Sequence, residues 1–255
     1  MTEREQINWL KIITGLLICA VITTRPAQAQ QSSGSLAIHF VHTANGQPLV
    51  LHEQTYKNTF GESYSLRKLR YYISHIGLTG SHSREVGDSY HLIDLSKEQE
   101  PLMLSCDTGR FIQLDFLLGI DSAAHCSGAQ TGALDPVNDM FWTWNSGYVI
   151  FKMEGESTAS TADLNRIEHH IGGYKGEQNV STAVSLKISQ AEAIHIRPGQ
   201  ITHVYIAMNL DHYWAGPSEV RISESPLCTT TGALAKKISA NFPGLFSIQR
   251  IENAP

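Results

Sequence analysis

Two short motifs in the second half of the chain carry residue types that could take part in metal chemistry. The first is a histidine doublet followed by isoleucine and two glycines, His169–Gly173. Neutral imidazole is a common ligand of transition metals, and glycines let the backbone approach a site closely. The second is the aromatic segment Met140–Tyr148, in which Trp142 and Trp144 are separated by one residue. Tryptophans at this spacing share one face of a strand or flank a pocket in a loop.

A third candidate, His39, lies in the run Leu36–Val41, where Leu36, Ile38 and Phe40 alternate with it. The alternation predicts a strand with its apolar face on the core and His39 on the opposite face, toward a polar or metal-lined cavity. Simpler interpretations stay open. The chain has twelve histidines, so chance neighbours are expected. Taken alone, the tryptophans are explained by core packing, because each aromatic side chain buries about 150–250 Å².

Other chemistries have little support in the sequence. It contains no nucleophile elbow, zinc-protease helix, P-loop or dinucleotide fingerprint. The pairs Asp135/Asp139 and Glu154/Glu156 are candidate acid–base carboxylates, but their spacing alone indicates nothing. The sequence therefore predicts a protein that is not an enzyme. A net charge of −5 argues against nucleic-acid binding, which normally requires a basic face.

The elements that must position these residues are mostly strands. Short apolar or alternating runs, separated by turn residues, occur at 36–41, 70–78, 90–95, 111–120, 147–154, 182–188, 194–196 and 201–210. Only Gly232–Asn241 has a helical pattern. We therefore expect an all-β fold, a single β-sandwich domain with long loops and one short C-terminal helix. The segment Asp121–Met140 has no sustained period, and we expect it to be a long functional loop.

The N-terminus has the three parts of a secretory signal peptide. Charged residues reach Lys11, Ile12–Ile22 is apolar, and Ala27–Ala29 is a small-x-small cleavage site. We therefore predict a signal peptide at 1–29 and an exported domain at 30–255, although a buried N-terminal helix is an alternative. The apolar run is shorter than the ~20 residues that span a bilayer, and no longer run follows.

Export would place the remaining cysteines in an oxidising compartment. These are Cys106, Cys126 and Cys228. A bond between Cys106 and Cys126 is the simplest pairing, because it closes a loop of ~20 residues and would contribute about 3 kcal/mol. Sequence alone does not fix the connectivity, so Cys228 is either a buried thiol or a partner for one of the others.

Four motifs together resemble the MbnP-like family of periplasmic proteins, which are related to a methanobactin-associated copper-binding protein. The resemblance extends from about Leu36 to about Ile251, and the motifs that carry it are Leu69–Ile76, Ser127–Pro136, Met140–Tyr148 and His169–Gly173. One position departs from the pattern, since His75 stands where the family resemblance leads us to expect asparagine.

The resemblance implies a β-sandwich that binds copper through histidines and a tryptophan oxidised to kynurenine. It also implies a partner, a di-haem enzyme similar to cytochrome c peroxidase, that performs the oxidation. Carried over to this chain, Trp142 and Trp144 are the candidates for oxidation. His39 and His170 are the candidate metal ligands, with His169 as a substitute for His170.

Two functions from different classes follow from these expectations. The first is an exported, periplasmic copper-binding accessory protein that captures or hands over copper. The second is a recognition or structural module without a metal, in which the tryptophans form core or a ligand platform. A secreted hydrolase is a third alternative, supported only by export and the long glycine-containing loop.

Overall fold

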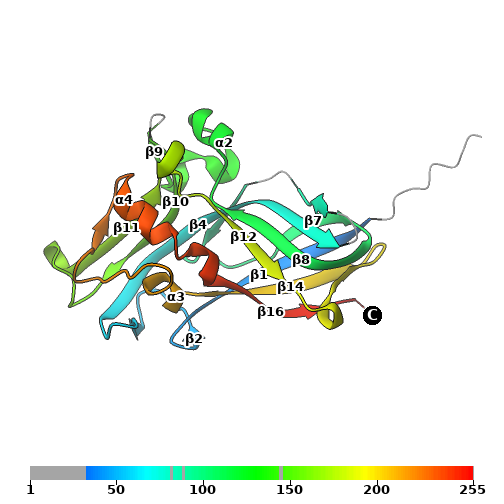
Figure 1. The fold of residues 1–255 in the computed structure, drawn as a ribbon, viewed down its shortest axis with the longest axis horizontal. Helices are drawn as coiled ribbons and strands as arrows, with labels where there is room; N and C mark the ends of the chain where they lie inside the picture. Colours follow the sequence, from blue (N-terminus) through cyan, green and yellow to red (C-terminus); the bar gives the residue numbers. More distant parts are fainter. Residues whose placement is uncertain (1–32, 81–82, 88–89, 144–145, 255) are drawn as a thin grey trace, which may run out of the picture. The chain divides into compact units, whose positions relative to one another are not determined.

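Two β-sheets packed face to face form the framework of the structure (Figure 1), a computed structural model that describes residues 33–80, 83–87, 90–143 and 146–254. These residues belong to one compact unit. The predicted signal peptide, residues 1–29, lies outside the described residues. Within the described ranges, no helix is both long enough and apolar enough to cross a membrane.

The smaller sheet, sheet A, is built around the N-terminal strand of the domain. Its strands are β1 (Ser33–Ala44), β2 (Gln47–Pro48), β7 (Leu102–Asp107), β14 (Ile201–Asn209) and β16 (Phe246–Glu252). Strand β1 pairs with β14 in parallel and with β2 and β7 in antiparallel orientation. Asn45 and Gly46 form the turn between β1 and β2, and both residues have a positive φ, as a two-residue hairpin turn requires.

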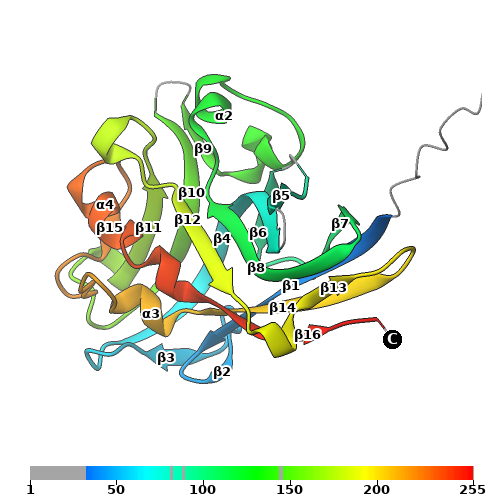
Figure 2. The same ribbon diagram turned by 45° about the vertical axis from the view of Figure 1, so that its right-hand side comes forward.

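The larger sheet, sheet B, surrounds the long strand β4. Its strands are β3 (Thr55–Lys57), β4 (Ser63–Gly80), β5 (Ser83–Glu85), β6 (His91–Asp94), β8 (Gly109–Leu118), β9 (Phe141–Thr143), β10 (Gly147–Glu156), β11 (Arg166–Gly172), β12 (Thr182–Lys187), β13 (Ile194–Ile196) and β15 (Leu227–Cys228). The main order is β12-β8-β4-β10-β11-β15, and β9 extends from β10. Figure 2 shows β9, β10 and α2 (Ser122–Cys126) gathered at one end of this sheet.

The core lies between the two sheets and is rich in aromatic rings. Alternation along β1 buries Leu36 and Ile38, as the sequence predicts, and leaves His39 on the other face. Phe40 of β1 meets Tyr71 of β4 and Phe116 of β8 edge to face, with ring centroids 6.1 and 6.2 Å apart. Such contacts between the sheets fix their relative position. The all-β sandwich expected from the sequence is confirmed.

Helices are short and lie between strands. They are α2, α3 (Asp211–Trp214) and α4 (Ala233–Ser239), together with the 3₁₀ turns η1 (Gly132–Leu134), η2 (Pro136–Asn138), η3 (Asp163–Asn165), η4 (Gly176–Gln178), η5 (Gln190–Glu192) and η6 (Phe242–Leu245). The predicted C-terminal helix is α4. The segment 121–140 is not an open loop, because α2, η1 and η2 give it structure. Tyr72 and Tyr148 donate hydrogen bonds to its carbonyl oxygens at Ala133 and Leu134.

The expected disulfide between Cys106 and Cys126 is not formed. All three described cysteines are free thiols; Cys106 and Cys228 are buried and Cys126 is exposed. Cys106 lies on β7, where it is paired with Gly34 of β1, whereas Cys126 ends helix α2 beside β10. Burial raises the pKa of Cys106 to about 12 and that of Cys228 to about 11, so both behave as apolar core residues.

Candidate functional site

The histidine doublet lies on strand β11, a strand that pairs with β10 on one side and β15 on the other. Side chains of a strand alternate between its two faces, so adjacent residues point in opposite directions. The side chain of His169 points inward, as do those of Ile167 and Ile171, and all three are fully buried. His170 faces outward with Glu168 and Gly172. The two histidines therefore serve different roles despite their adjacency.

His169 is a structural residue whose ring nitrogens are both occupied. Its Nε2–H donates to the carbonyl oxygen of Ser225 at 2.8 Å, and Nδ1 lies 2.7 Å from the hydroxyl of Tyr213. Because a carbonyl only accepts, Nε2 carries the proton and Nδ1 accepts from the tyrosine. Burial lowers the pKa of His169 to about 4, so the ring is neutral. No lone pair is left for a metal, and His169 cannot substitute for His170.

His170 presents a different arrangement on the outer face. Its Nε2 lies 2.9 Å from Oε1 of Glu154 on β10. The hydrogen bond from His170 lowers the pKa of Glu154 to about 2, assisted by Lys68 and opposed by burial. Glu154 is therefore a carboxylate that only accepts, and Nε2 must carry the proton. In the neutral ring, the lone pair is then on Nδ1, which has no hydrogen-bond partner among the described residues.

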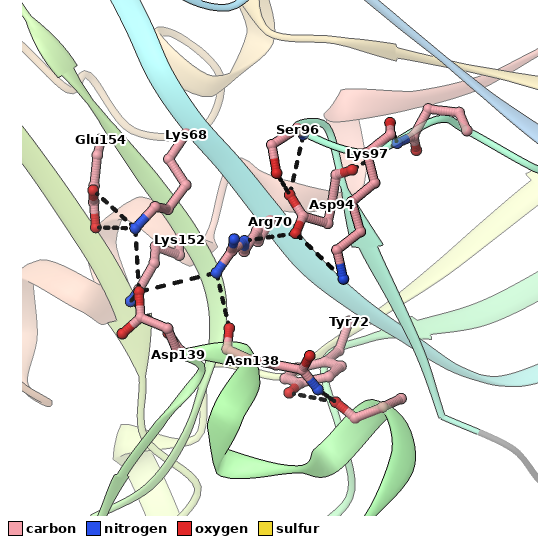
Figure 3. A network of polar contacts seen from close by, with 12 residues as sticks. Lys68, Arg70, Tyr72, Asp94, Ser96, Lys97, Asn138, Asp139, Lys152 and Glu154 are labelled. Carbon is pink, nitrogen blue, oxygen red and sulfur yellow. Dashed lines mark hydrogen bonds and ion pairs between the residues drawn. The ribbon is translucent and has the colours of Figure 1, made fainter.

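Glu154 belongs to a network of charges across the outer face of sheet B (Figure 3). Lys68 bridges Glu154 and Asp139 at 3.3 and 3.1 Å, and the nearly buried Lys152 also reaches Asp139, at 2.9 Å. Arg70 pairs with Asp94 at 2.9 Å and donates to the carbonyl oxygen of Asn138. Residues 138 and 139 directly precede the aromatic segment. The network therefore fixes where that segment begins and keeps Glu154 ionised.

The aromatic segment contacts the glycines of the histidine motif. Trp142 of β9 lies over Gly172, where an added Cβ would be only 2.6 Å from Cζ3 of the indole and 2.8 Å from the carbonyl oxygen of Tyr148. Gly172 is on the same face of β11 as His170, two positions away. The structure thus brings Trp142 and the His170 motif together. Trp142 is partly buried against the core, and Trp144 lies outside the described residues.

We call the contact region of Trp142, Gly172 and Tyr148 the corner of Trp142. His125 of α2, a residue that the sequence did not single out, lies beside it. It is fully buried, stacks on Tyr174 with centroids 4.7 Å apart, and accepts from the backbone N–H of Tyr148 at its Nδ1. Its Nε2–H has no partner in the described part of the chain. Burial lowers its pKa to about 4. Because Nδ1 already accepts, this ring offers no lone pair to a metal; only its place in the segment 121–140 could have drawn attention to it.

His39, the other predicted ligand, is not part of this corner. It lies on the outer face of sheet A, partly buried, and its Nε2 is 3.0 Å from Nδ1 of His203 on β14. Its ring stacks on Tyr205 with centroids 4.3 Å apart. The expected polar cavity around His39 is therefore an open sheet surface. His39 and His170 lie on different sheets, so they cannot bind one ion together in this fold.

A stable metal site in a protein usually has three or more protein ligands. Among the described residues, no group of three or more histidine, cysteine or carboxylate side chains is placed to hold an ion. The corner of Trp142 offers one oriented imidazole and one indole, whose N–H only donates. A shallow depression of about 200 Å³ adjoins it, lined by Ser146, Gly173, Tyr174, Lys175, Gln178 and Thr231. A larger groove of about 670 Å³ lies between β12 and β16, away from both motifs.

Comparisons with known proteins point to one family. The family model described as MbnP matches residues 33–230. Among solved structures, MbnP from Methylosinus trichosporium is similar, with a TM-score of 0.50, 11% sequence identity, and coverage of 75% of this chain and 80% of that one. At that identity the likeness concerns the fold alone. No curated protein sequence matches the chain.

Proposed function

The chain belongs to the MbnP family, and from that premise we propose that it is an exported copper-binding accessory protein of the periplasm, with its site at His170 and Trp142. The observation that carries the proposal is the orientation of His170. Its Nε2–H is held by Glu154 and its Nδ1 is left for a metal, two positions from the glycine that supports Trp142. A carboxylate that fixes the ring of a ligating histidine is a common arrangement behind protein metal sites.

Unmodified tryptophan does not complete such a site, so the proposal includes its oxidation. Two oxygen atoms, supplied by two molecules of hydrogen peroxide that are reduced to water, cleave the C2–C3 bond of the indole. Hydrolysis then releases C2 as formate and leaves kynurenine, with an aryl amine and a ketone. These groups can donate lone pairs, which the indole N–H cannot. Trp142 is the described candidate; Trp144 remains a candidate from the sequence.

A di-haem partner similar to cytochrome c peroxidase would use this hydrogen peroxide to perform the oxidation. Trp142 suits this reaction because it is partly buried, not enclosed in the core. The ligand set would join one imidazole with the kynurenine groups and leave at least one position for solvent or for a further ligand. An open position favours capture and handover of copper over tight storage. Copper favours imidazole nitrogen, and the charge network keeps the supporting carboxylate ionised.

The mass of the protein tests the oxidation step. The chain is exported from cells with and without the partner enzyme, and the intact mass and the tryptic peptides of each form are measured. Conversion of one tryptophan to kynurenine adds about 4 Da, and we expect that increase on the peptide containing Trp142 and Trp144 only when the partner is present. A Trp142→Phe variant separates the two tryptophans. Unmodified tryptophans together with copper binding weaker than micromolar would overturn the proposal in favour of a module without a metal.

A further inference from the structure

A second pair of histidines, on the outer face of sheet A, has no role in the function proposed above. His39 is on β1 and His203 on β14, 164 residues away in sequence. The two strands pair in parallel, with Ala37 opposite His203 and His39 opposite Tyr205. The histidines are thus diagonal neighbours on one face, while Ile38 and Val204 between them point into the core.

The spacing of the two imidazoles matches that of two ligands on one ion. Nε2 of His39 and Nδ1 of His203 are 3.0 Å apart. Two nitrogens at ~2.0–2.1 Å from a metal, with an angle of roughly 90–110° between the bonds, are separated by about 2.8–3.4 Å. The same atoms form one hydrogen bond when no metal is present. For both of these nitrogens to bind one ion, the proton between them moves to the other nitrogen of its own ring by exchange with water, and both imidazoles stay neutral.

His39 is also held in place before any ion arrives. Tyr205 stacks on its ring at 4.3 Å and 10°, and the guanidinium of Arg250 covers the Tyr205 ring at 3.8 Å from the centroid. Glu252, which is opposite His203 on β16, lies 3.3 Å from Arg250 and 3.2 Å from the hydroxyl of Tyr205. The carboxylate therefore offsets the positive charge of the arginine on this face.

The electrostatic surroundings favour the neutral form of the imidazole. The pKa of His39 is lowered by partial burial first, then by His203 and Arg250, and is raised only by Glu252. A neutral imidazole is the form that binds a metal. In the described part of the chain no third histidine, cysteine or carboxylate joins the pair in a metal-binding arrangement, so water would fill the remaining positions and the ion would exchange readily.

We propose that His39 and His203 form a second metal site, a two-histidine surface site for a divalent transition cation such as Zn²⁺ or Cu²⁺. The site lies on a different sheet from His170 and Trp142 and needs no modified residue. It does not rest on the copper proposal, and each stands if the other fails.

Zinc titration of the full exported protein tests the proposal. Isothermal titration calorimetry measures the affinity, and proton NMR follows the imidazole resonances. We expect the resonances of His39 and His203 to shift on saturation. His39→Gln and His203→Gln should each weaken zinc binding by about tenfold or more, while the matched surface control His212→Ala leaves it unchanged. Because both glutamine variants change solvent-accessible positions, thermal unfolding confirms that they fold. If His39→Gln and His203→Gln bind zinc as the unmodified chain does, or if His212→Ala weakens binding equally, the proposal is wrong.

Discussion

The two outer faces of the sandwich place their histidines by different means. On sheet B, His170 is held by a carboxylate inside a network of charges, beside a tryptophan. On sheet A, His39 is held by a second histidine and a stacked tyrosine. The sequence pairs His169 with His170, but the fold separates them, whereas His39 and His203 are distant in sequence and touch. Pairing in space, not adjacency in sequence, decides which histidines can share an ion.

The largest loss of stability expected from a single substitution separates the two members of the doublet. His169→Ala removes a fully buried ring and leaves Tyr213 and the Ser225 carbonyl without partners, which should lower the free energy of unfolding by about 3 kcal/mol. His170→Ala, on the outer face, should cost less than about 1 kcal/mol. Urea unfolding followed by circular dichroism measures both. Equal losses would show that the doublet does not divide between core and surface.

The buried histidines should also make stability depend on pH. Burial lowers the pKa of His42, His125 and His169 to about 4. At a pH between about 4, the pKa in the folded protein, and about 6.5, the pKa in the unfolded chain, the unfolded chain therefore binds more protons than the folded protein. Their contribution is complete above about pH 6.5 and is lost as the pH falls, by up to about 1.4 kcal/mol per pH unit for each residue.

Unfolding at about pH 7 and about pH 5 checks this slope. We expect His169→Gln to lower this slope by up to about 1.4 kcal/mol per pH unit, the contribution of one buried histidine. A stability that does not fall between these two conditions contradicts the burial of the three rings.

A smaller effect tests the contact between the tryptophan segment and β11. Gly172→Ala adds a methyl group that would press on both Trp142 and the backbone of Tyr148, so we expect a loss of about 2 kcal/mol and a shift of tryptophan fluorescence. Gly244→Ala is the matched control, because nothing lies within 4 Å of its added Cβ. Equal stability of the two variants would mean that Trp142 does not rest on Gly172.

The smallest of these effects concerns the carboxylate behind His170. Glu154→Gln keeps a hydrogen-bond acceptor but removes the charge, so copper affinity should fall by about tenfold, with little change in zinc binding at His39. Competition with a chelator of known copper affinity measures the loss. A variant that binds copper as tightly as the unmodified chain would remove Glu154 from the site.

Much of the fold was predictable because alternation is a local signal. The pattern around Leu36, Ile38 and Phe40 predicts β1 and the outward direction of His39, and the structure confirms both. Strand β11 was missed, since His169 occupies an inward position where an apolar residue is expected and hides the alternation. The predicted disulfide is absent because its two cysteines lie on different parts of the sandwich. Pairing of β7 with β1 places Cys106 on sheet A, whereas Cys126 is in α2, which contacts β10 of sheet B.

The candidate site was only partly predictable. The types of its residues are visible in the sequence, as is the use of glycine beneath Trp142. The partners are not, because Glu154 and His203 become neighbours of His170 and His39 only through the pairing of strands. A parallel pairing such as that of β1 with β14 leaves no signal in local spacing.

The central proposal is tested most directly by copper titration of the oxidised protein. The copper affinities of the His170→Ala and His39→Ala variants are compared with that of the unmodified chain. Binding of Cu(I) is measured by competition with a chelator after the partner enzyme has acted. We expect His170→Ala to weaken copper binding by more than about tenfold and His39→Ala to leave it unchanged. If His170→Ala binds copper as the unmodified chain does, the placement of the copper site at His170 and Trp142 is contradicted.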